Sequence, residues 1–464
     1  MPVNSFDNYP MAWKPERAKL KKPLYQSLAA YLEADITSGF LLPDTKLPPQ
    51  RELADFLDIN FTTVTRAYKL CEEKGLIHAV VGKGTFVSPH SGHNSTISLS
   101  DSPHSVIDLA FIASFERFNA LLCDSVRAVA ASSSLPTLFD YSYPTGMPAH
   151  KRAAVSWLAR YGYSADTERL SIVSGVQNGV SLSLIALFNA GDKIAVDPFT
   201  FPNFTEFARA NHIRLVPVPS DTDGMRPDLL AEQARLNGVK GVFLMPNCNN
   251  PTTAAISPTR RMELARVIRD YGLILIEDDI YGFLQADTDN PVPPVSALAS
   301  DNSVYICGTS KPIASGLRVG YMAYAERFKA ALESALFNVN VKTSSLEAQI
   351  ITELINSGAA DTIVRRKLQA AKRANALFDA LFPDAPKPQT PYSFFRILPV
   401  NSALRGIDAE RFIEGYGVRV YHSDRFAVAA GDESKFLRVS LATAPDEAVL
   451  ERGLLLLKTA VSQL

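Results

Sequence analysis

The sequence has few cysteines and no long hydrophobic run. Its four cysteines stand far apart without a C-x-x-C spacing, at Cys71, Cys123, Cys248 and Cys307. This distribution indicates neither a zinc or other metal site nor a disulfide framework. No stretch of about 18 apolar residues is present, and no charged-then-apolar leader opens the chain. We therefore expect a cytoplasmic protein without membrane contact.

The sequence also lacks a strong charge of either sign. Its formal net charge of -1 does not favour nucleic acid as a partner of the whole chain. A small basic module on a neutral body remains compatible with that balance, because only the local field matters. The 464 residues are 47% hydrophobic and 20% charged, as in globular proteins. The length predicts about two or three domains.

The first 88 residues contain three stretches of helical periodicity and then two short apolar runs. The helices are expected at residues 24–36, 47–57 and 61–74. Gly39 and Gly75 would end the first and the third helix. The apolar runs on either side of residues 82–84 predict a hairpin. Together these elements predict a winged helix-turn-helix domain, and a small helical protein-interaction domain is the alternative that periodicity leaves open.

The third helix of this domain is the candidate for the major groove of DNA. In such domains the residues at the start of that helix lie nearest the bases. Short polar and basic side chains occupy its outer face, which suits contacts to phosphates and base edges. The expected DNA-contacting residues are Arg51, Thr62, Thr63, Arg66, Lys83 and Gly84.

Several motifs in this region resemble the GntR-type winged-helix domain of bacterial regulators. In chain order they are Leu47-Pro-x-x-Arg-Glu-Leu-Ala, Thr63-Val-x-x-Ala-Tyr, Glu73-x-Gly-Leu-Ile and Gly82-x-Gly-Thr-Phe-Val87. The resemblance covers residues 20–88 and implies binding to operator DNA as a dimer. The sequence departs from the family at Pro49, where Ser is frequent, but a helix start tolerates proline.

Residues 89–106 are polar, rich in Ser and His, and without periodicity, which predicts a flexible linker. In the remainder, residues 107–464, short apolar runs alternate with helical stretches. This alternation predicts an α/β domain with a mostly parallel, seven-stranded sheet. The expected strands are residues 170–173, 194–196, 215–218, 242–245, 273–276, 304–307 and 319–323.

The segments that follow these runs are candidates for a binding site, because ligands of parallel sheets lie beyond the carboxyl ends of the strands. Residues 174–179 open a helix whose backbone donors suit an anion. Residues 197–202 supply aromatic rings and residues 246–253 supply amides. Residues 277–281 add a carboxylate and a phenol. Each segment alone is more often a turn than a site, but together they fit one ligand.

Lys311 and Arg318 follow the run at 304–307 and stand among small and apolar residues. Loss of hydration there would lower the pKa of the lysine and make its amine available for a Schiff base. The arginine suits a phosphate. A carbonyl and a phosphate in one ligand indicate pyridoxal 5′-phosphate (PLP). On this stretch alone, ordinary surface charges are an equally good interpretation, and the preceding strand ends favour PLP.

Residues 107–464 resemble the fold-type I aminotransferase domain, which implies PLP as cofactor. In this resemblance Lys311 forms the Schiff base, Asp278 holds the pyridinium nitrogen and Arg438 binds the carboxylate of a substrate or effector. The other residues assigned to PLP are Gly175, Val176, Gln177, Thr309, Ser310 and Arg318 near the phosphate, Asn250 and Tyr281 at the phenolic oxygen, Phe201 on the ring, and Tyr141 (or Tyr143 in a competing alignment) reaching the partner subunit's phosphate.

The sequence departs from that family at a few positions. Thr253 stands where Gly is usual, Phe201 replaces a Tyr, and Gly308 occupies a position where Ser or Thr commonly binds phosphate. These differences bear on catalysis more than on cofactor binding.

A GntR-type domain joined to an aminotransferase-like body resembles the MocR subfamily of bacterial transcription regulators. That resemblance implies a head-to-tail homodimer that binds operator DNA and senses PLP or an amino compound. The alternative is a catalytically active PLP-dependent aminotransferase that acts on an amino acid. A metabolic transaminase has no use for Arg51, Arg66 and the hairpin, so we favour the regulator, with weak transaminase activity compatible with it.

Overall fold

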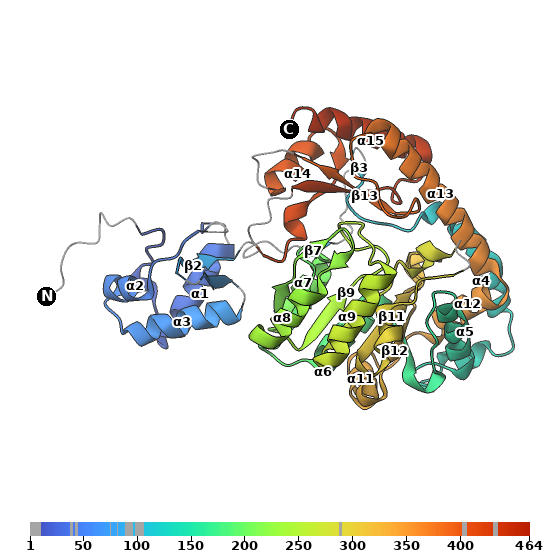
Figure 1. Ribbon diagram of the computed structural model, residues 1–464, viewed down its shortest axis with the longest axis horizontal. Helices are drawn as coiled ribbons and strands as arrows, with labels where there is room; N and C mark the ends of the chain where they lie inside the picture. The colour runs from blue at the N-terminus through green and yellow to red at the C-terminus, as the bar shows by residue number, and fades with distance from the viewer. Residues whose placement is uncertain are drawn as a thin grey trace.

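The computed structural model describes residues 11–37, 40–41, 45–74, 76–80, 82–88, 96–97, 106–286, 290–400, 406–429 and 435–464. Figure 1 shows a small N-terminal domain and a larger body that contains an extended sheet. Within the described ranges, no helix is both long and apolar enough to cross a membrane. Of the predicted linker, residues 96, 97 and 106 are described.

Three helices and a hairpin form the N-terminal domain, in the predicted order. They are α1 (Leu24–Thr37), α2 (Gln50–Leu57), α3 (Phe61–Glu73), β1 (Ile77–Val80) and β2 (Gly84–Val87), after a short 3-10 helix, η2 (Arg17–Lys19). Both α1 and α2 pack against α3. Val64, Ala67 and Cys71 of α3 lie in the resulting core. The antiparallel pairing of β1 with β2 leaves Gly82 and Lys83 at the hairpin tip.

Helix α2 begins at Gln50 and not at residue 47, so the predicted start was wrong. Pro48 and Pro49 explain the difference, because a residue that precedes proline is driven out of the helical conformation. Leu47 instead donates its backbone N–H to the carbonyl of Thr85 at 2.8 Å, which ties it to the hairpin. The predicted helix ends at Gly39 and Gly75 lie outside the described residues.

A seven-stranded sheet forms the centre of the body, and each of its strands overlaps a predicted apolar run. In spatial order the strands are β4 (Leu170–Val173), β12 (Gly320–Tyr324), β11 (Ser303–Gly308), β10 (Ile274–Asp278), β9 (Gly241–Leu244), β5 (Lys193–Val196) and β6 (Arg214–Pro217). Only β12 runs antiparallel to its neighbours within this sheet. The prediction of a mostly parallel seven-stranded sheet is confirmed.

Neighbouring residues of the central strands enter two different cores. In β9, Phe243 belongs to one hydrophobic cluster, and Val242 and Leu244 belong to another. Helix α6 (Val176–Leu187) packs against β10, β11 and β12, while residues of α9 (Pro258–Asp270) lie in the second cluster. Because both faces of the sheet are covered, its strands are mostly apolar.

The other helices of this part surround the sheet (Figure 1). They are α4 (Cys123–Ala130), α5 (Pro148–Ala159), α7 (Pro202–Ala210), α8 (Pro227–Asn237), α10 (Val295–Leu298), α11 (Lys329–Asn340) and α12 (Ser345–Asn356). Short 3-10 helices used below are η3 (Glu116–Leu122), η4 (Leu135–Phe139) and η8 (Ser315–Leu317).

The C-terminal part of the body has a hydrophobic core of its own, shared with the long helix α13 (Ala359–Leu381). Its elements are β13 (Phe395–Pro399), α14 (Gly406–Glu414), β14 (Val418–Arg419), β15 (Tyr421–His422), β16 (Phe436–Ser440) and α15 (Glu447–Val461). Strand β3 (Ile107–Asp108) pairs with β14. The segment directly after the predicted linker is therefore fixed in the C-terminal core.

Candidate functional site

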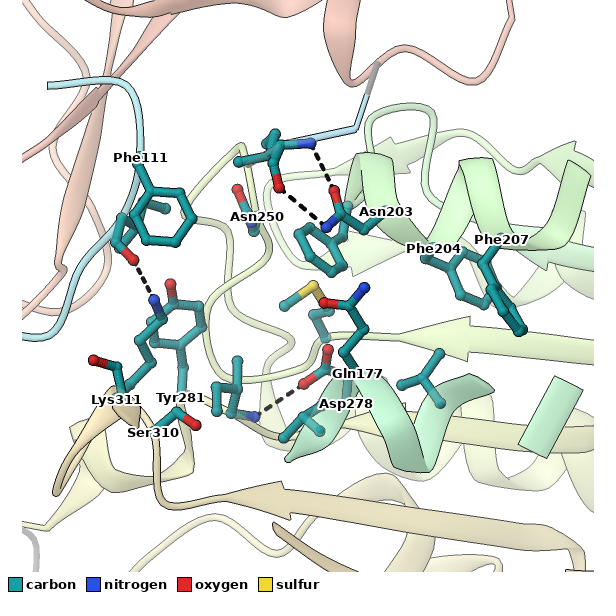
Figure 2. Close-up of a pocket in the computed structure, with 18 of the residues that line it drawn as sticks. Phe111, Gln177, Asn203, Phe204, Phe207, Asn250, Asp278, Tyr281, Ser310 and Lys311 are labelled. Atoms are coloured by element: carbon teal, nitrogen blue, oxygen red, sulfur yellow. Dashed lines mark hydrogen bonds between the residues drawn. The ribbon is translucent and has the colours of Figure 1, made fainter. Parts of the chain in front are cut away.

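A cavity of about 200 Å³ lies beyond the carboxyl ends of the parallel strands. Figure 2 shows side chains from strand ends and helix starts converging on it. Most of the residues predicted to bind the cofactor or the effector line this cavity, namely Val176, Gln177, Phe201, Asn250, Asp278, Tyr281, Ser310, Lys311, Arg318 and Arg438. Residues far apart in the sequence therefore meet in one place, as the strand-end argument predicts.

Lys311 directs its amine across the cavity toward the segment after β3 (Figure 2). Its Nζ donates a hydrogen bond to the carbonyl of Ile112 and lies 5.6 Å from the centre of the Phe111 ring. Burial, with the positive charges of Arg438 and Arg318 nearby, lowers the pKa of Lys311 to about 7. A large share of this amine is therefore neutral and nucleophilic near neutral pH.

Asp278 ends β10 and is buried, with Tyr281 three residues further along the same cavity wall. Its Oδ1 accepts the N–H of Ile280 at 3.1 Å. Burial, with the negative charge of the neighbouring Asp279, raises the pKa of Asp278 to about 7. Among the described residues this buried carboxylate has no cationic partner, so it is suited to bind a cationic group of a ligand.

The two acidic neighbours of Asp278 form hydrogen bonds within the protein and stabilise its fold. Glu277 accepts the backbone N–H groups of Val295 and Ser296 at 2.9 and 2.6 Å. Asp279 accepts the hydroxyl of Tyr305 and the amide of Asn247, both at 2.6 Å. Among these three consecutive acids, Asp278 alone lines the cavity.

The start of α6, Ser310 and Arg318 form a cradle for an anion. Gly175 precedes α6 with φ +84°, and a Cβ there would lie 2.8 Å from Nη2 of Arg318. Nη1 of Arg318 donates to Oγ of Ser310 at 3.3 Å. A guanidinium next to the free N–H groups of a helix start is an arrangement that binds phosphate. Gly175 does not itself line the cavity but makes room for the arginine.

Thr309 lies outside the cavity wall, in contrast to Ser310. Its side chain is fully buried and donates to the carbonyl of Val319 at 2.8 Å. Packing explains why glycine occupies position 308. A Cβ there would lie 2.4 Å from Cδ1 of Ile280 and 2.5 Å from Cγ2 of Val176. A side chain at this position, where the resemblance to the aminotransferases implies Ser or Thr, would require Ile280 and Val176 to shift.

Arg438 comes from β16 and is a buried cation at the cavity. Its Nη1 donates to Oδ1 of Asn250 at 2.8 Å, and its Nη2 donates to the carbonyl of Ala110. Its Nε is buried without a hydrogen-bond partner within the described structure. Burial lowers the pKa of Arg438 to about 10. This guanidinium has neutral oxygens around it, so it retains the capacity to bind a carboxylate.

Tyr141 and Tyr143 lie away from the cavity of their own chain. They are 84% and 50% exposed. Lys342 binds the backbone of this segment, because its Nζ donates to the carbonyls of Asp140 and Ser142 at 2.6 and 3.0 Å. The contact of Tyr141 with the partner subunit's phosphate stays a prediction.

The predicted DNA-contacting residues lie at the start of α2, along α3 and at the hairpin tip. Arg51, Thr62, Arg66, Lys83 and Gly84 are exposed, and Thr63 is half-exposed. The guanidinium of Arg66 stacks 4.1 Å from the centre of the Tyr25 ring, while that of Arg51 lies 5.8 Å from the Phe61 ring. Asn60 accepts the N–H of Thr62 at 2.8 Å and so caps α3. This cap fixes where the helix presents its first residues.

The cavity also contains residues that the sequence did not predict as site residues. They are Ile97, Phe111, Ile112, Val180, Ser181, Asn203, Phe204, Phe207, Met245, Ile280 and Ser315. Phe204 and Phe207 follow Phe201 at helical spacing, a signal that was available. The contribution of Ile112 is its backbone carbonyl, which every residue has, so no sequence signal could have identified it.

Comparisons with known proteins identify relatives of both the N-terminal domain and the body. Residues 114–454 match the family model "Aminotransferase class I and II", and residues 24–87 match "Bacterial regulatory proteins, gntR family". An uncharacterized HTH-type transcriptional regulator of Bacillus subtilis strain 168, YdeF, is 33% identical over 464 residues, with 100% of both chains covered. The chain belongs to the MocR subfamily of GntR-type transcription regulators.

Other relatives of this MocR regulator include the vitamin B6 salvage pathway transcriptional repressor PtsJ of Salmonella typhimurium. It is 29% identical over 292 residues, which are 62% of this chain and 64% of PtsJ. Among solved structures, an archaeal alanine:glyoxylate aminotransferase has a TM-score of 0.71 at 20% identity, covering 77% and 91% of the two chains. A multiple substrate aminotransferase from Thermococcus profundus has a TM-score of 0.70 at 20% identity, covering 79% and 96%. These structures confirm the fold of the body.

Proposed function

We propose that this transcription regulator holds PLP on Lys311, senses PLP or an amino compound in its cavity, and binds operator DNA as a head-to-tail homodimer in the cytoplasm. The observation that carries the proposal is the meeting of Lys311, Asp278 and the anion cradle in one cavity. The same chain has exposed cations on a winged helix-turn-helix domain.

The residues of the cavity fit PLP group by group. Lys311 offers a neutral amine to the aldehyde, and Asp278 offers a buried carboxylate to the protonated ring nitrogen. The start of α6 with Ser310 and Arg318 offers donors to the phosphate. PLP would supply an aldehyde that exchanges between amines. Arg438 is then left for a group of the effector.

The remaining lining favours an amino acid with an apolar side chain as the effector. Among the described residues that line the cavity, Asp278 is the one carboxylate, and it is assigned to the ring nitrogen. A second ammonium group, as in a diamine, would therefore find no counter-charge. Arg438 suits a carboxylate, and Phe111, Phe204 and Phe207 suit an apolar side chain.

Catalytic transamination is the second candidate, because Arg438 and Lys311 line the same cavity. This pair would hold an amino acid by its carboxylate beside an amine that can move a proton. Formation of a 2-oxo acid from L-leucine and 2-oxoglutarate, measured on the purified protein, would test it.

The decisive experiment on the proposed function is operator binding with and without PLP. The affinity of the full-length protein for the DNA upstream of its own gene would be measured by fluorescence anisotropy. We expect PLP to change this affinity severalfold and Lys311→Ala to remove the change. Equal affinity with and without PLP in the wild type would contradict PLP as a signal.

PLP capture should become faster as the pH rises through about 7, because the pKa of Lys311 is lowered to about 7. Below that pH the amine is an ammonium and cannot attack an aldehyde. At neutral pH the neutral fraction exceeds that of an ordinary lysine by roughly a thousandfold. Stopped-flow absorbance on both sides of pH 7 would measure the midpoint.

A matched variant tests the cause of this pH dependence. The charge of Arg438 is one of the causes of the lowered pKa of Lys311. Arg438→Met should therefore move the midpoint to higher pH, since a positive neighbour disfavours the ammonium. A rate that rises only at the pH where exposed lysines titrate would contradict the lowered pKa.

A further inference from the structure

One described residue of the linker, Ile97, lies at the cavity. Ile97 is 7% exposed, and its side chain is part of the cavity lining. Its N–H donates to Oδ1 of Asn203 at 2.8 Å, and its carbonyl accepts from Nδ2 of the same residue at 3.2 Å. Figure 2 shows both hydrogen bonds of Asn203, directed at the linker from the start of α7. We call this pair the Ile97–Asn203 clamp.

The clamp satisfies both backbone groups of Ile97 with one side chain. A carboxamide offers one acceptor and two donors, so it can bind a backbone N–H and a backbone C=O together. A residue with its own backbone paired and its side chain buried is fixed in position. Asn203 also lines the cavity, so both members of the clamp lie beside any ligand that fills it.

Ile97 also lies where two parts of the body meet. It belongs to a small hydrophobic cluster with Phe199, Phe426 and Phe436. Phe199 follows β5 of the large sheet and forms a bridge with Ala427 of the C-terminal part.

The same cluster contacts Arg438, whose guanidinium we assign to the carboxylate of the effector. The guanidinium of Arg438 lies 4.8 Å from the centre of the Phe426 ring. Linker, sheet, C-terminal part and Arg438 are therefore in contact through this one cluster.

We propose that Ile97 is a ligand-contacting residue contributed by the linker, and that the clamp couples occupancy of the cavity to the N-terminal domain. This inference rests on the proposed function and narrows it. The ligand is an amino acid held on PLP, with its carboxylate at Arg438 and its apolar side chain against Ile97. Such a ligand stabilises the clamp, and by linkage the docked linker raises the affinity for the ligand by the same factor.

Hydrogen exchange at the amide of Ile97 tests the clamp in the full-length protein. With PLP and L-leucine as the probe, we expect this amide to exchange about fivefold to tenfold more slowly than with PLP alone, the effect of strengthening one hydrogen bond. Asn203→Ala should accelerate the exchange and remove the response to leucine. The effect of leucine on DNA affinity should disappear in the same variant.

Asn211→Ala is the matched control. Asn211 lies directly after α7 and donates to the carbonyl of Phe207 at 2.8 Å, outside the cavity lining. It should behave as the wild type in both measurements. Ile97→Ala adds a test of specificity, because the affinity for L-leucine should fall by more than the affinity for glycine, which has no side chain to contact residue 97.

The outcomes separate this inference from the proposed function. If the wild type gains no absorbance with PLP, the proposed function fails. The absorbance could appear while the amide of residue 97 exchanges at the same rate with leucine, without leucine and in Asn203→Ala. That result would overturn the proposed role of the clamp. Equal losses of leucine and glycine affinity in Ile97→Ala would overturn Ile97 as a ligand contact.

Discussion

Lys311→Ala should yield a protein that no longer gains the visible absorbance of PLP held on a lysine. Within the described structure, Lys311 is the one lysine that lines the cavity. The nearest substitute, Lys367, is fully buried and directs its Nζ to the carbonyls of Ile313 and Lys311 at 2.7 and 3.2 Å. It cannot reach the cavity without breaking both bonds. We therefore expect complete loss of the absorbance.

The comparison variants for this experiment are Lys311→Arg and Lys458→Ala. An arginine keeps the positive charge but offers no amine that forms a Schiff base, so the absorbance should again be lost. Lys458 is exposed in α15, and its removal should change nothing. PLP should still bind weakly to Lys311→Ala, because Asp278 and the anion cradle remain. Persistence of the absorbance in Lys311→Ala would place the cofactor on another lysine.

Arg51→Ala should weaken operator binding about tenfold and reduce the salt dependence of binding by the equivalent of about one released counterion. Arg51 is exposed in the first turn of α2, and its guanidinium lies near Phe61, the first residue of α3. It is therefore placed beside the element that we assign to the major groove. Anisotropy titrations with operator DNA at several salt concentrations would measure both quantities.

Arg51 gives a cleaner test than Arg66. Arg66 stacks on Tyr25 of α1, so Arg66→Ala would disturb the packing of the domain as well as any DNA contact. Arg452→Ala, at an exposed position of α15, is the charge-matched control and should bind DNA as the wild type does. PLP absorbance should be normal in both variants. Unchanged affinity and salt dependence in Arg51→Ala would remove Arg51 from the DNA interface.

The sheet was predictable because its strands are buried on both faces. A strand of this kind, such as β11, is buried at every position and mostly apolar, so it stands out between helical stretches. Backbone hydrogen bonds outside the sheet were harder to predict. The one between Leu47 and Thr85 joins two residues whose types do not indicate that they pair. Trp13 shows the same limit, since it is 1% exposed and donates to Asp35 at 2.8 Å, but no periodic segment contains it.

The site was predictable to the extent that its groups are side chains at strand ends. Asp278 ends β10 and Lys311 follows β11, and the carboxyl ends of these parallel neighbouring strands lie at one edge of the sheet. The partner of the Lys311 amine was not predictable, because it is the carbonyl of Ile112, far away in the sequence. The linker contact of Asn203 was hidden for the same reason, since it binds only the backbone of Ile97.

The crowding around Gly175 has a consequence for other sequences of the family. A Cβ at Gly175 would meet Arg318, one at Gly308 would meet Ile280 and Val176, and one at Gly320 would lie 3.0 Å from the carbonyl carbon of Gly175. These three absent side chains shape the phosphate end of the cavity as much as the residues that are present. A relative with a larger residue at Gly175 must therefore move the Arg318 guanidinium, and one with a larger residue at Gly320 must move the backbone that precedes α6, so a change at either glycine alters where a phosphate can bind.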